Sequence, residues 1–206
     1  MSDARVAPGW ATRARARWRY TGVSRPHFAH TPGAQQESVW DYPRPPRWER
    51  EPREVSVRLP AGAEPEAGTG AAELAHSHSS VRVLETAAPP TFYLPPADVQ
   101  SDRLERAPGS SRCEWKGEAV YWRLSPGRSA DGSDSSEFPE EPVAWSYPDP
   151  FPEFETIRGW FAFYPSRLDC WLDGVRVLPQ PGGFYGGWVT PELAGPFKGE
   201  PGSEDW

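Results

Sequence analysis

The chain has 206 residues and a formal net charge of -7 at pH 7, with 26 Pro, 19 Gly, 11 Trp and a single Met. This length favours one domain, and the supply of Pro and Gly favours turns and short strands over long helices. An acidic protein repels phosphate backbones, so we expect no nucleic-acid partner. Six arginines among the first 25 residues depart from this balance, and we interpret them as a solvated or docked arm.

Hydropathy and cysteine content indicate the compartment. No segment approaches the roughly 18 apolar residues of a membrane helix, and the first residues lack the apolar core of a secretory signal. We therefore expect a cytoplasmic protein with no membrane partner. Two cysteines, Cys113 and Cys170, fit a reducing compartment without a disulfide framework, and they are too few for a four-cysteine zinc site.

Composition divides the chain into three regions. Residues 1–46 are rich in Arg and Pro and show neither a helical nor a strand period, which predicts an extended arm. Residues 47–178 contain the alternating segments and form a single β-rich domain. Residues 179–206 return to Gly and Pro but carry aromatic side chains, which predicts a second arm. These aromatic residues need apolar surface, so we expect the arms to dock on the body of the chain, giving a monomer, or on a second copy, giving a homodimer.

Alternation of apolar and polar residues predicts an all-β, or β-rich, fold for the central domain. Single helical turns are expected at 95–99 and 153–158, and the Asp173-Gly174 pair suits a type I′ hairpin turn. Strands are expected at 54–59, 74–76, 81–86, 91–94, 143–150 and 160–164, with hairpins at 111–122 and 169–178.

The hairpin at 111–122 brings a thiol, an acid and a base beside large aromatic surface. It is predicted to turn at Lys116 and the glycine that follows, and it holds one of only two cysteines and one of only two lysines in the chain. Alternation places Cys113 and Trp115 on one face. Glu114 and Lys116 then share the opposite face.

A carboxylate in the strand at 81–86 points to a pocket. Alternation puts Glu85 on the same face as the buried Val81 and Val83. We therefore predict a ligand pocket with apolar walls and a few convergent polar groups, drawn from several strands. The alternative is a buried ion pair or network that only fixes strand register. The predicted polar residues are Glu85, Lys116, Tyr121, Tyr147 and Tyr164, and the predicted aromatic walls are Trp115, Trp145 and Phe163.

Catalysis is an alternative use of the same residues. Lys116 and the nearby Arg112 would favour the thiolate form of Cys113, which is the reactive form of a cysteine. The opposing interpretation is that Cys113 is a small buried apolar residue. A further possibility is that Glu85 and Lys116 act as an acid–base pair.

Metal and cofactor binding have little support. His76 and His78 would lie on one face of a strand and could chelate zinc, with Cys113 as a third ligand. The other ligands of such a site are not evident. The Gly-rich motifs that bind nucleotide phosphates are also missing. We therefore predict neither a metal site nor a cofactor.

Five blocks of the sequence resemble the bacterial family called domain of unknown function 427. They are E-S-V-W-D-Y-P-R-P-P, V-R-V-L-E-T followed by P-P-T-F-Y-L-P-P-A-D-V, C-E-W-K-G-E-A-V-Y-W, A-W-S-Y-P-D-P and Q-P-G-G-F-Y-G-G-W-V-T-P-E-L-A-G-P-F-K-G. The resemblance runs from about residue 18 to residue 206, so the chain looks like a full-length member with both arms. It implies a β-tent, or Mss4-like, fold in which two antiparallel sheets meet at an angle.

The resemblance also bears on function. Several β-tent proteins hold zinc in two C-x-x-C knuckles, which this chain lacks, so it looks like a metal-free version. Members are sometimes labelled nucleotidyltransferases, but the paired acids and Gly-Ser turn of that chemistry are missing. The polar residues carried over from the family are Arg82, Glu85, Cys113, Lys116, Tyr121 and Tyr147. Our leading hypothesis is a domain that binds a small organic ligand between its sheets. The alternatives are an enzyme and a protein-interaction module that acts through its aromatic arms.

Overall fold

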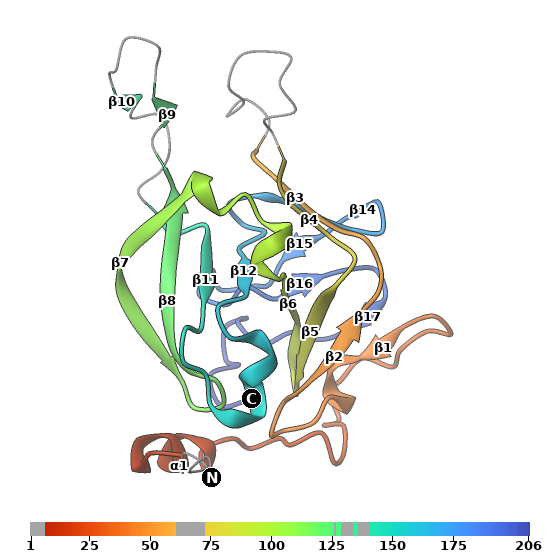
Figure 1. The fold of residues 1–206 in the computed structure, drawn as a ribbon. Coiled ribbons are helices and arrows are strands. Elements are labelled where there is room, and N and C mark those ends of the chain that lie inside the picture. Colours follow the sequence, from red (N-terminus) through yellow and green to blue (C-terminus); the bar gives the residue numbers. More distant parts are fainter. Residues whose placement is uncertain (1–6, 61–72, 126, 129–133, 136–140) are drawn as a thin grey trace.

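The structure, a computed structural model, describes residues 7–60, 73–125, 127–128, 134–135 and 141–206. Its described residues form mostly antiparallel sheets, which confirms the all-β prediction (Figure 1). Two of these sheets enclose the site described below. Among the described residues, no helix combines the length and apolar character required to cross a bilayer.

The first of these two sheets contains the predicted central hairpin. Its strand order is β12-β11-β8-β7, and every neighbouring pair is antiparallel. The hairpin is confirmed, but its first strand begins at Leu104, earlier than expected, and residues 114–116 form the turn. The strands are β7 (Leu104–Cys113), β8 (Gly117–Leu124), β11 (Ala144–Ser146) and β12 (Phe161–Phe163).

The second sheet meets the first along one edge. It consists of β2 (Arg47–Glu51), β5 (Ser80–Glu85) and β6 (Ala88–Tyr93) in the order β2-β5-β6. Leu94, just after β6, pairs with Phe161 of β12 through two backbone hydrogen bonds of 2.8 and 3.0 Å. Two antiparallel sheets that meet along one edge agree with the arrangement that the family resemblance implies.

A third sheet holds the remaining predicted strands in the order β14-β13-β3-β4. Asp173 (φ 49°) and Gly174 (φ 74°) both adopt positive φ, as the predicted type I′ turn requires. An apolar core fills the space between this sheet and the other two, with Phe92, Phe163 and Trp188 among its largest side chains. The strands are β3 (Val55–Arg58), β4 (Glu73–Ser77), β13 (Asp169–Leu172) and β14 (Val175–Arg176).

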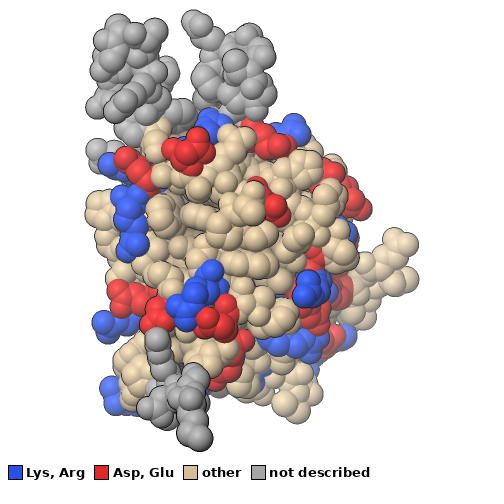
Figure 2. Space-filling model, viewed as in Figure 1, with Lys and Arg blue, Asp and Glu red and all other residues tan. Residues whose placement is uncertain are grey.

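Short helices and strands complete the described chain. The helical turns expected at 95–99 and 153–158 are present as η2 (Pro96–Asp98) and η4 (Pro152–Ile157), and η3 (Ser101–Arg103) follows η2. Strands β9 (Gly127–Arg128) and β10 (Asp134–Ser135) pair with each other. Figure 2 shows acidic and basic side chains interspersed over the described part of one face.

The two arms pack on the body and on each other. Strand β1 (Glu37–Ser38) of the first arm pairs in parallel with β17 (Leu193–Ala194) of the second. Trp40, fully buried in η1 (Val39–Asp41), donates its indole N–H to the Pro196 carbonyl over 3.1 Å. Its ring packs against Phe28 and Trp206 with centroids 5.2 and 5.1 Å away. Leu84 and Ala87 of the body belong to the same buried cluster, so within this chain the arms contact the body as well as each other.

The arms contain more regular secondary structure than the sequence predicted. The first arm was expected to be extended, but it contains α1 (Gly9–Arg15), the only α-helix among the described residues. Strand β15 (Leu178–Pro179), at the start of the second arm, pairs with β16 (Trp188–Val189) within it. Trp188 is fully buried in the core beside Phe92, so the second arm is an integral part of the fold.

Candidate functional site

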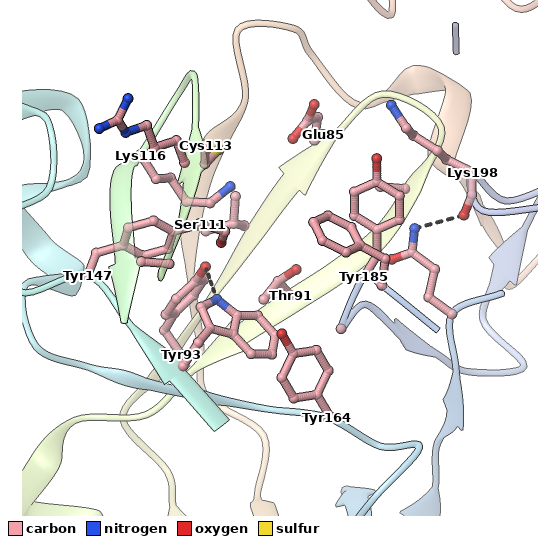
Figure 3. A pocket seen from close by; sticks show the side chains of 18 of the residues that line it. Glu85, Thr91, Tyr93, Ser111, Cys113, Lys116, Tyr147, Tyr164, Tyr185 and Lys198 are labelled. Carbon is pink, nitrogen blue, oxygen red and sulfur yellow. Dashed lines mark hydrogen bonds between the residues drawn. The ribbon is translucent and has the colours of Figure 1, made fainter. Parts of the chain in front are cut away.

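A cavity of about 240 Å³ lies between the first and second sheets (Figure 3). Its walls come from β5 and β6 on one side and from β7, β8 and β11 on the other, and both arms contribute residues. This is the position between the sheets that the leading hypothesis requires. Figure 3 shows the labelled hydroxyl, thiol, amine and carboxylate groups converging from these elements.

Strand alternation places several side chains in the cavity as predicted. Val83 and Glu85 of β5 line it, and Ala119 and Tyr121 of β8 line it from the facing sheet. Alternate residues of a strand share a face, so each strand presents two of these side chains together. Trp145, Tyr147 and Tyr164, which were also predicted for the pocket, line the cavity too.

Lys116 supplies a buried cation. It is 9% exposed, and its Nζ lies 5.7 Å from the centre of the Phe154 ring and 6.0 Å from that of Tyr147. Burial works to lower the pKa of Lys116, but attraction to Cys113, Tyr93 and Glu85 outweighs burial and raises this pKa above its ordinary value. Lys116 is therefore a charged ammonium that faces the cavity.

Two buried tyrosines accompany this cation. Burial raises the pKa of Tyr93 to about 12, although Lys116 acts in the opposite direction. Burial also raises the pKa of Tyr147 well above its ordinary value. The Trp145 indole N–H donates to the Tyr93 hydroxyl over 3.4 Å. Both tyrosines keep their protons at neutral pH and offer hydroxyl donors beside Lys116.

The two cysteines occupy different environments. Cys113, at the end of β7, is partly exposed and lines the cavity, close enough to Lys116 to contribute to its raised pKa. Cys170 lies in the core, and burial raises its pKa well above the ordinary value. Cys113 is thus the thiol that a molecule in the cavity would meet.

The Glu85 carboxylate pairs with an arginine that sequence reasoning missed. Its Oε1 lies 3.2 Å from the Arg44 guanidinium, which also donates to the carbonyls of Tyr20 and Thr86. Among the described residues, Glu85 and Lys116 line the same cavity without forming an ion pair. The acid–base pair of Glu85 and Lys116 is therefore not seen as a direct contact, because Arg44 occupies the carboxylate.

The arms supply residues that the sequence did not indicate as part of the site. Trp18 of the first arm lines the cavity, and Lys198 of the second places its Nζ 3.3 Å from the centre of the Trp18 ring. Burial lowers the pKa of Lys198 to about 8, assisted by repulsion from Arg44. Tyr185, also in the second arm, stays 39% exposed at the cavity. The arms therefore form part of the cavity wall.

Glycine is required where the second arm crosses the cavity wall. A Cβ atom at Gly186 would lie 2.2 Å from the Trp145 ring, and one at Gly187 would lie 2.3 Å from the Gln180 side chain. Gln180 holds this segment by donating to the Lys198 carbonyl over 2.8 Å and accepting from the Gly187 N–H over 3.1 Å. Close approach to Trp145 therefore explains Gly186, and close approach to Gln180 and Pro89 explains Gly187.

Three predicted site residues lie away from the cavity, which corrects their assignment. Phe163, predicted as an aromatic wall, is fully buried in the apolar core instead. Arg82 lies on the opposite face of β5 from Glu85 and binds the carboxylates of Glu37 (2.5 Å) and Glu49 (3.2 Å). Trp115 is buried under α1, with the Arg15 guanidinium 4.9 Å from its ring centre. Residues 114–116 form the hairpin turn, where strand alternation does not apply, and Trp115 therefore points away while Lys116 lines the cavity.

The three metal ligands considered from the sequence are not brought together. Cys113 lines the cavity, whereas His76 and His78 lie at the end of β4. Glu54, which precedes β3, is the third residue near the two histidines with an atom that could bind a metal ion. None of these three residues lines the cavity.

Comparison with known proteins identifies the family. The sequence profile of the family described as domain of unknown function (DUF427) matches residues 47–174, which include the two sheets that enclose the cavity. The blocks of the arms that contributed to the resemblance lie outside this match. A comparison with curated proteins gave no match. With more than half of its length matched, the chain belongs to the DUF427 family.

Proposed function

We propose that this protein binds a small organic carboxylate with an aromatic or similarly flat body in the cavity between its sheets. The observation that carries the proposal is the Lys116 ammonium, which is buried, faces the cavity and forms no ion pair among the described residues. Burial opposes the charge of Lys116, and Cys113, Tyr93 and Glu85 attract it without a direct ion pair. The carboxylate of a ligand would supply a counter-charge in direct contact.

The remaining walls suit a flat body. Tyr164 lies 4.5 Å from Trp145, ring centre to ring centre, and Tyr93 lies 6.3 Å from Trp145. Aromatic side chains offer large apolar area and favour stacked or edge contacts with other rings. The volume of about 240 Å³ is below the roughly 300–1,000 Å³ of sites for drug-sized ligands. The ligand is therefore a compact molecule.

The donors around Lys116 favour a carboxylate over a phosphate. The Tyr93 and Tyr147 hydroxyls stay protonated beside the ammonium. A phosphate is more often held by paired arginine donors or by a cradle of backbone N–H groups. Among the residues that the structure describes, Arg112 is the one arginine that lines the cavity, and its side chain is exposed.

Titration with benzoate and benzamide, followed by NMR of the labelled full chain, tests the proposal. The two compounds share size and shape but differ in charge. We expect saturable binding of benzoate that is roughly tenfold or more tighter than that of benzamide, because a hydrogen bond to a charged group contributes about 1.5–3 kcal/mol. Lys116→Met should lose this preference, while Arg50→Met, an exposed control, should keep it. Equal affinities for the two compounds, or an unchanged preference in Lys116→Met, would overturn the proposal.

A second candidate function is covalent catalysis by Cys113. The observation that favours it is the position of the Cys113 thiol, which lines the cavity close to Lys116 and would meet a bound molecule there. Cys170 serves as an internal control because it is buried in the core.

Alkylation by iodoacetamide at pH 7, with the modified residues identified by mass spectrometry, tests this candidate. Catalysis predicts that Cys113 reacts faster than free N-acetylcysteine and that Lys116→Met slows the reaction, while Cys170 stays unmodified. A Cys113 that reacts no faster than N-acetylcysteine would contradict a thiolate mechanism and would leave the carboxylate proposal unaffected.

A further inference from the structure

Two histidines and a carboxylate converge on one face of the β3–β4 hairpin, away from the cavity. The ligand atoms of Glu54, His76 and His78 all lie within 4.8 Å of one another. The Glu54 Oε2 atom is 3.8 Å from the His76 Nε2 and 4.0 Å from the His78 Nε2. Both imidazoles thus present the same nitrogen to one carboxylate.

Strand register explains this convergence. Val55 of β3 pairs with Ser77 of β4, and Ser56 pairs with His76. Extending the antiparallel register by one residue puts Glu54 opposite His78, and alternation places His76 on the same face. The sequence pointed to the two histidines but not to Glu54, because Glu54 is far from them along the chain.

The backbone around the three side chains is held in place. The Ser77 hydroxyl, between the two histidines, donates to the Asp98 carboxylate over 2.6 Å and accepts from the Ser79 N–H over 3.0 Å. The carbonyl of Glu54 accepts a hydrogen bond of 2.8 Å from the Asp173 N–H. Only side-chain rotation is therefore needed to adjust the three groups.

A second carboxylate lies behind His76. The Nδ1 atom of His76 is 3.5 Å from the Glu73 Oε2. This nitrogen is on the opposite side of the ring from the Nε2 atom that faces Glu54. Metal-binding histidines commonly donate their other ring N–H to a carboxylate, which fixes the tautomer and the ring orientation. Glu73 is placed to serve this purpose for His76.

We propose that Glu54, His76 and His78 bind a divalent transition-metal ion such as Zn²⁺, with Glu73 positioning His76. Two imidazole nitrogens and one carboxylate oxygen match the ligands that Zn²⁺ prefers, and water completes the coordination. Bond lengths of about 2.0–2.2 Å in a tetrahedral site bring ligand atoms to roughly 3.3 Å from one another. The observed separations of 3.8 and 4.0 Å reach that value through small rotations. Mg²⁺ and Ca²⁺ prefer oxygen ligands and do not fit this set.

Calorimetric titration of the tag-free full chain with Zn²⁺ and with Mg²⁺ tests the proposal. We expect one saturable Zn²⁺ site and no Mg²⁺ binding, with perturbation of the imidazole resonances of His76 and His78 in NMR spectra. His76→Gln and His78→Gln should each abolish the site. Glu73→Gln should retain it with an affinity about tenfold lower, as the loss of an orienting partner predicts.

The other two histidines and Cys113 supply matched controls. His27 and His30 are exposed and complete the set of four histidines, so the double change His27→Gln/His30→Gln should leave Zn²⁺ affinity unchanged. Cys113→Ser should also leave it unchanged, which separates this site from the cavity. The three ligands are at least 44% exposed, so their substitution should not prevent folding. Unchanged Zn²⁺ affinity after loss of both His76 and His78, or the absence of a saturable site, would overturn the proposal.

Discussion

The buried pair of Arg44 and Glu85 shows how single residues balance charge at the cavity. The side chain of Arg44 is only 2% exposed, and Glu85 is the carboxylate that pairs with it. Removing one partner of such a pair leaves a buried charge uncompensated, which commonly costs about 3–5 kcal/mol, with a smaller cost here because Glu85 is 19% exposed.

A double-mutant cycle measures how strongly Arg44 and Glu85 stabilise each other. We expect Glu85→Gln to lower the free energy of unfolding by about 2–3 kcal/mol. Arg44→Met should also destabilise the protein, because the carbonyls of Tyr20 and Thr86 lose a donor. The double variant Glu85→Gln/Arg44→Met should be more stable than the sum of the single losses predicts, as measured by urea unfolding. Strict additivity would show that the pair does not couple.

Lys198 should titrate far below an ordinary lysine. Burial lowers its pKa to about 8 from 10.5, while the pKa of Lys116 is raised. These are the only lysines in the chain, so ¹³C-lysine labelling should give two resonances. The chemical shift of the Lys198 resonance should change with a midpoint near pH 8. The chemical shift of the Lys116 resonance should stay constant beyond pH 10.5. Two midpoints near the ordinary value would contradict these environments.

The same shift predicts the pH dependence of stability. Below pH 8 Lys198 is protonated in both the folded and the unfolded chain, so its burial penalty is fully present. Between pH 8 and 10.5 the unfolded chain holds more protons, so the contribution of Lys198 to stability rises with pH. The shift corresponds to a change on the order of 3 kcal/mol. Lys198→Met should remove this rise in urea unfolding measured across the window.

At the scale of elements, the segment from Gln180 to Gly187 closes one wall of the cavity through backbone. We expect Gly186→Ala to destabilise the protein by about 1–3 kcal/mol, because its Cβ would overlap the Trp145 ring. Gly33→Ala is the control, since a Cβ there meets nothing closer than 3.4 Å. Thermal unfolding measures both changes. A Gly186→Ala variant as stable as the control would show that the segment moves freely.

The strands that line the cavity illustrate what sequence patterns predict. A period of two placed Val83, Glu85, Ala119 and Tyr121 on the cavity side, because these residues belong to strands β5 and β8. The same rule failed at Trp115 and Lys116, since the hairpin turn changes the direction of successive side chains. Local periodicity therefore predicts orientation only where the backbone is a strand.

Contacts made by the arms lie outside such patterns. Trp18 meets Lys198, and Arg44 meets Glu85, across long separations in sequence. Arms rich in Pro and Gly show no period that would predict what they pack against. Their aromatic content predicted docking, but neither the location of the docking surface nor the role of the arms in the cavity wall could follow from one sequence.

At the scale of the whole molecule, the arms and the body form a common core. Trp188 of the second arm is fully buried against Phe92 and donates its indole N–H to the Phe163 carbonyl over 3.1 Å. Loss of a buried tryptophan commonly costs about 3–5 kcal/mol, a large part of the stability of a domain. We therefore expect that residues 47–178, the central region of the division at residues 46 and 178, do not fold without the arms.

A fragment that contains only residues 47–178 tests this view. We expect it to lack a cooperative unfolding transition and the near-UV circular dichroism of packed aromatic side chains, because both Trp40 and Trp188 are missing. The full chain is the control and should unfold in one transition. A fragment that unfolds cooperatively would mean that the arms are dispensable for folding.

The central claim is that the cavity holds an organic carboxylate against Lys116. Native mass spectrometry of the gently purified full chain, followed by identification of any compound released on unfolding, tests it most directly. The account predicts a reproducible additional mass that is released as an organic acid and is retained in Arg50→Met but lost in Lys116→Met. A released compound without an acidic group, or the same occupancy in Lys116→Met, would contradict it.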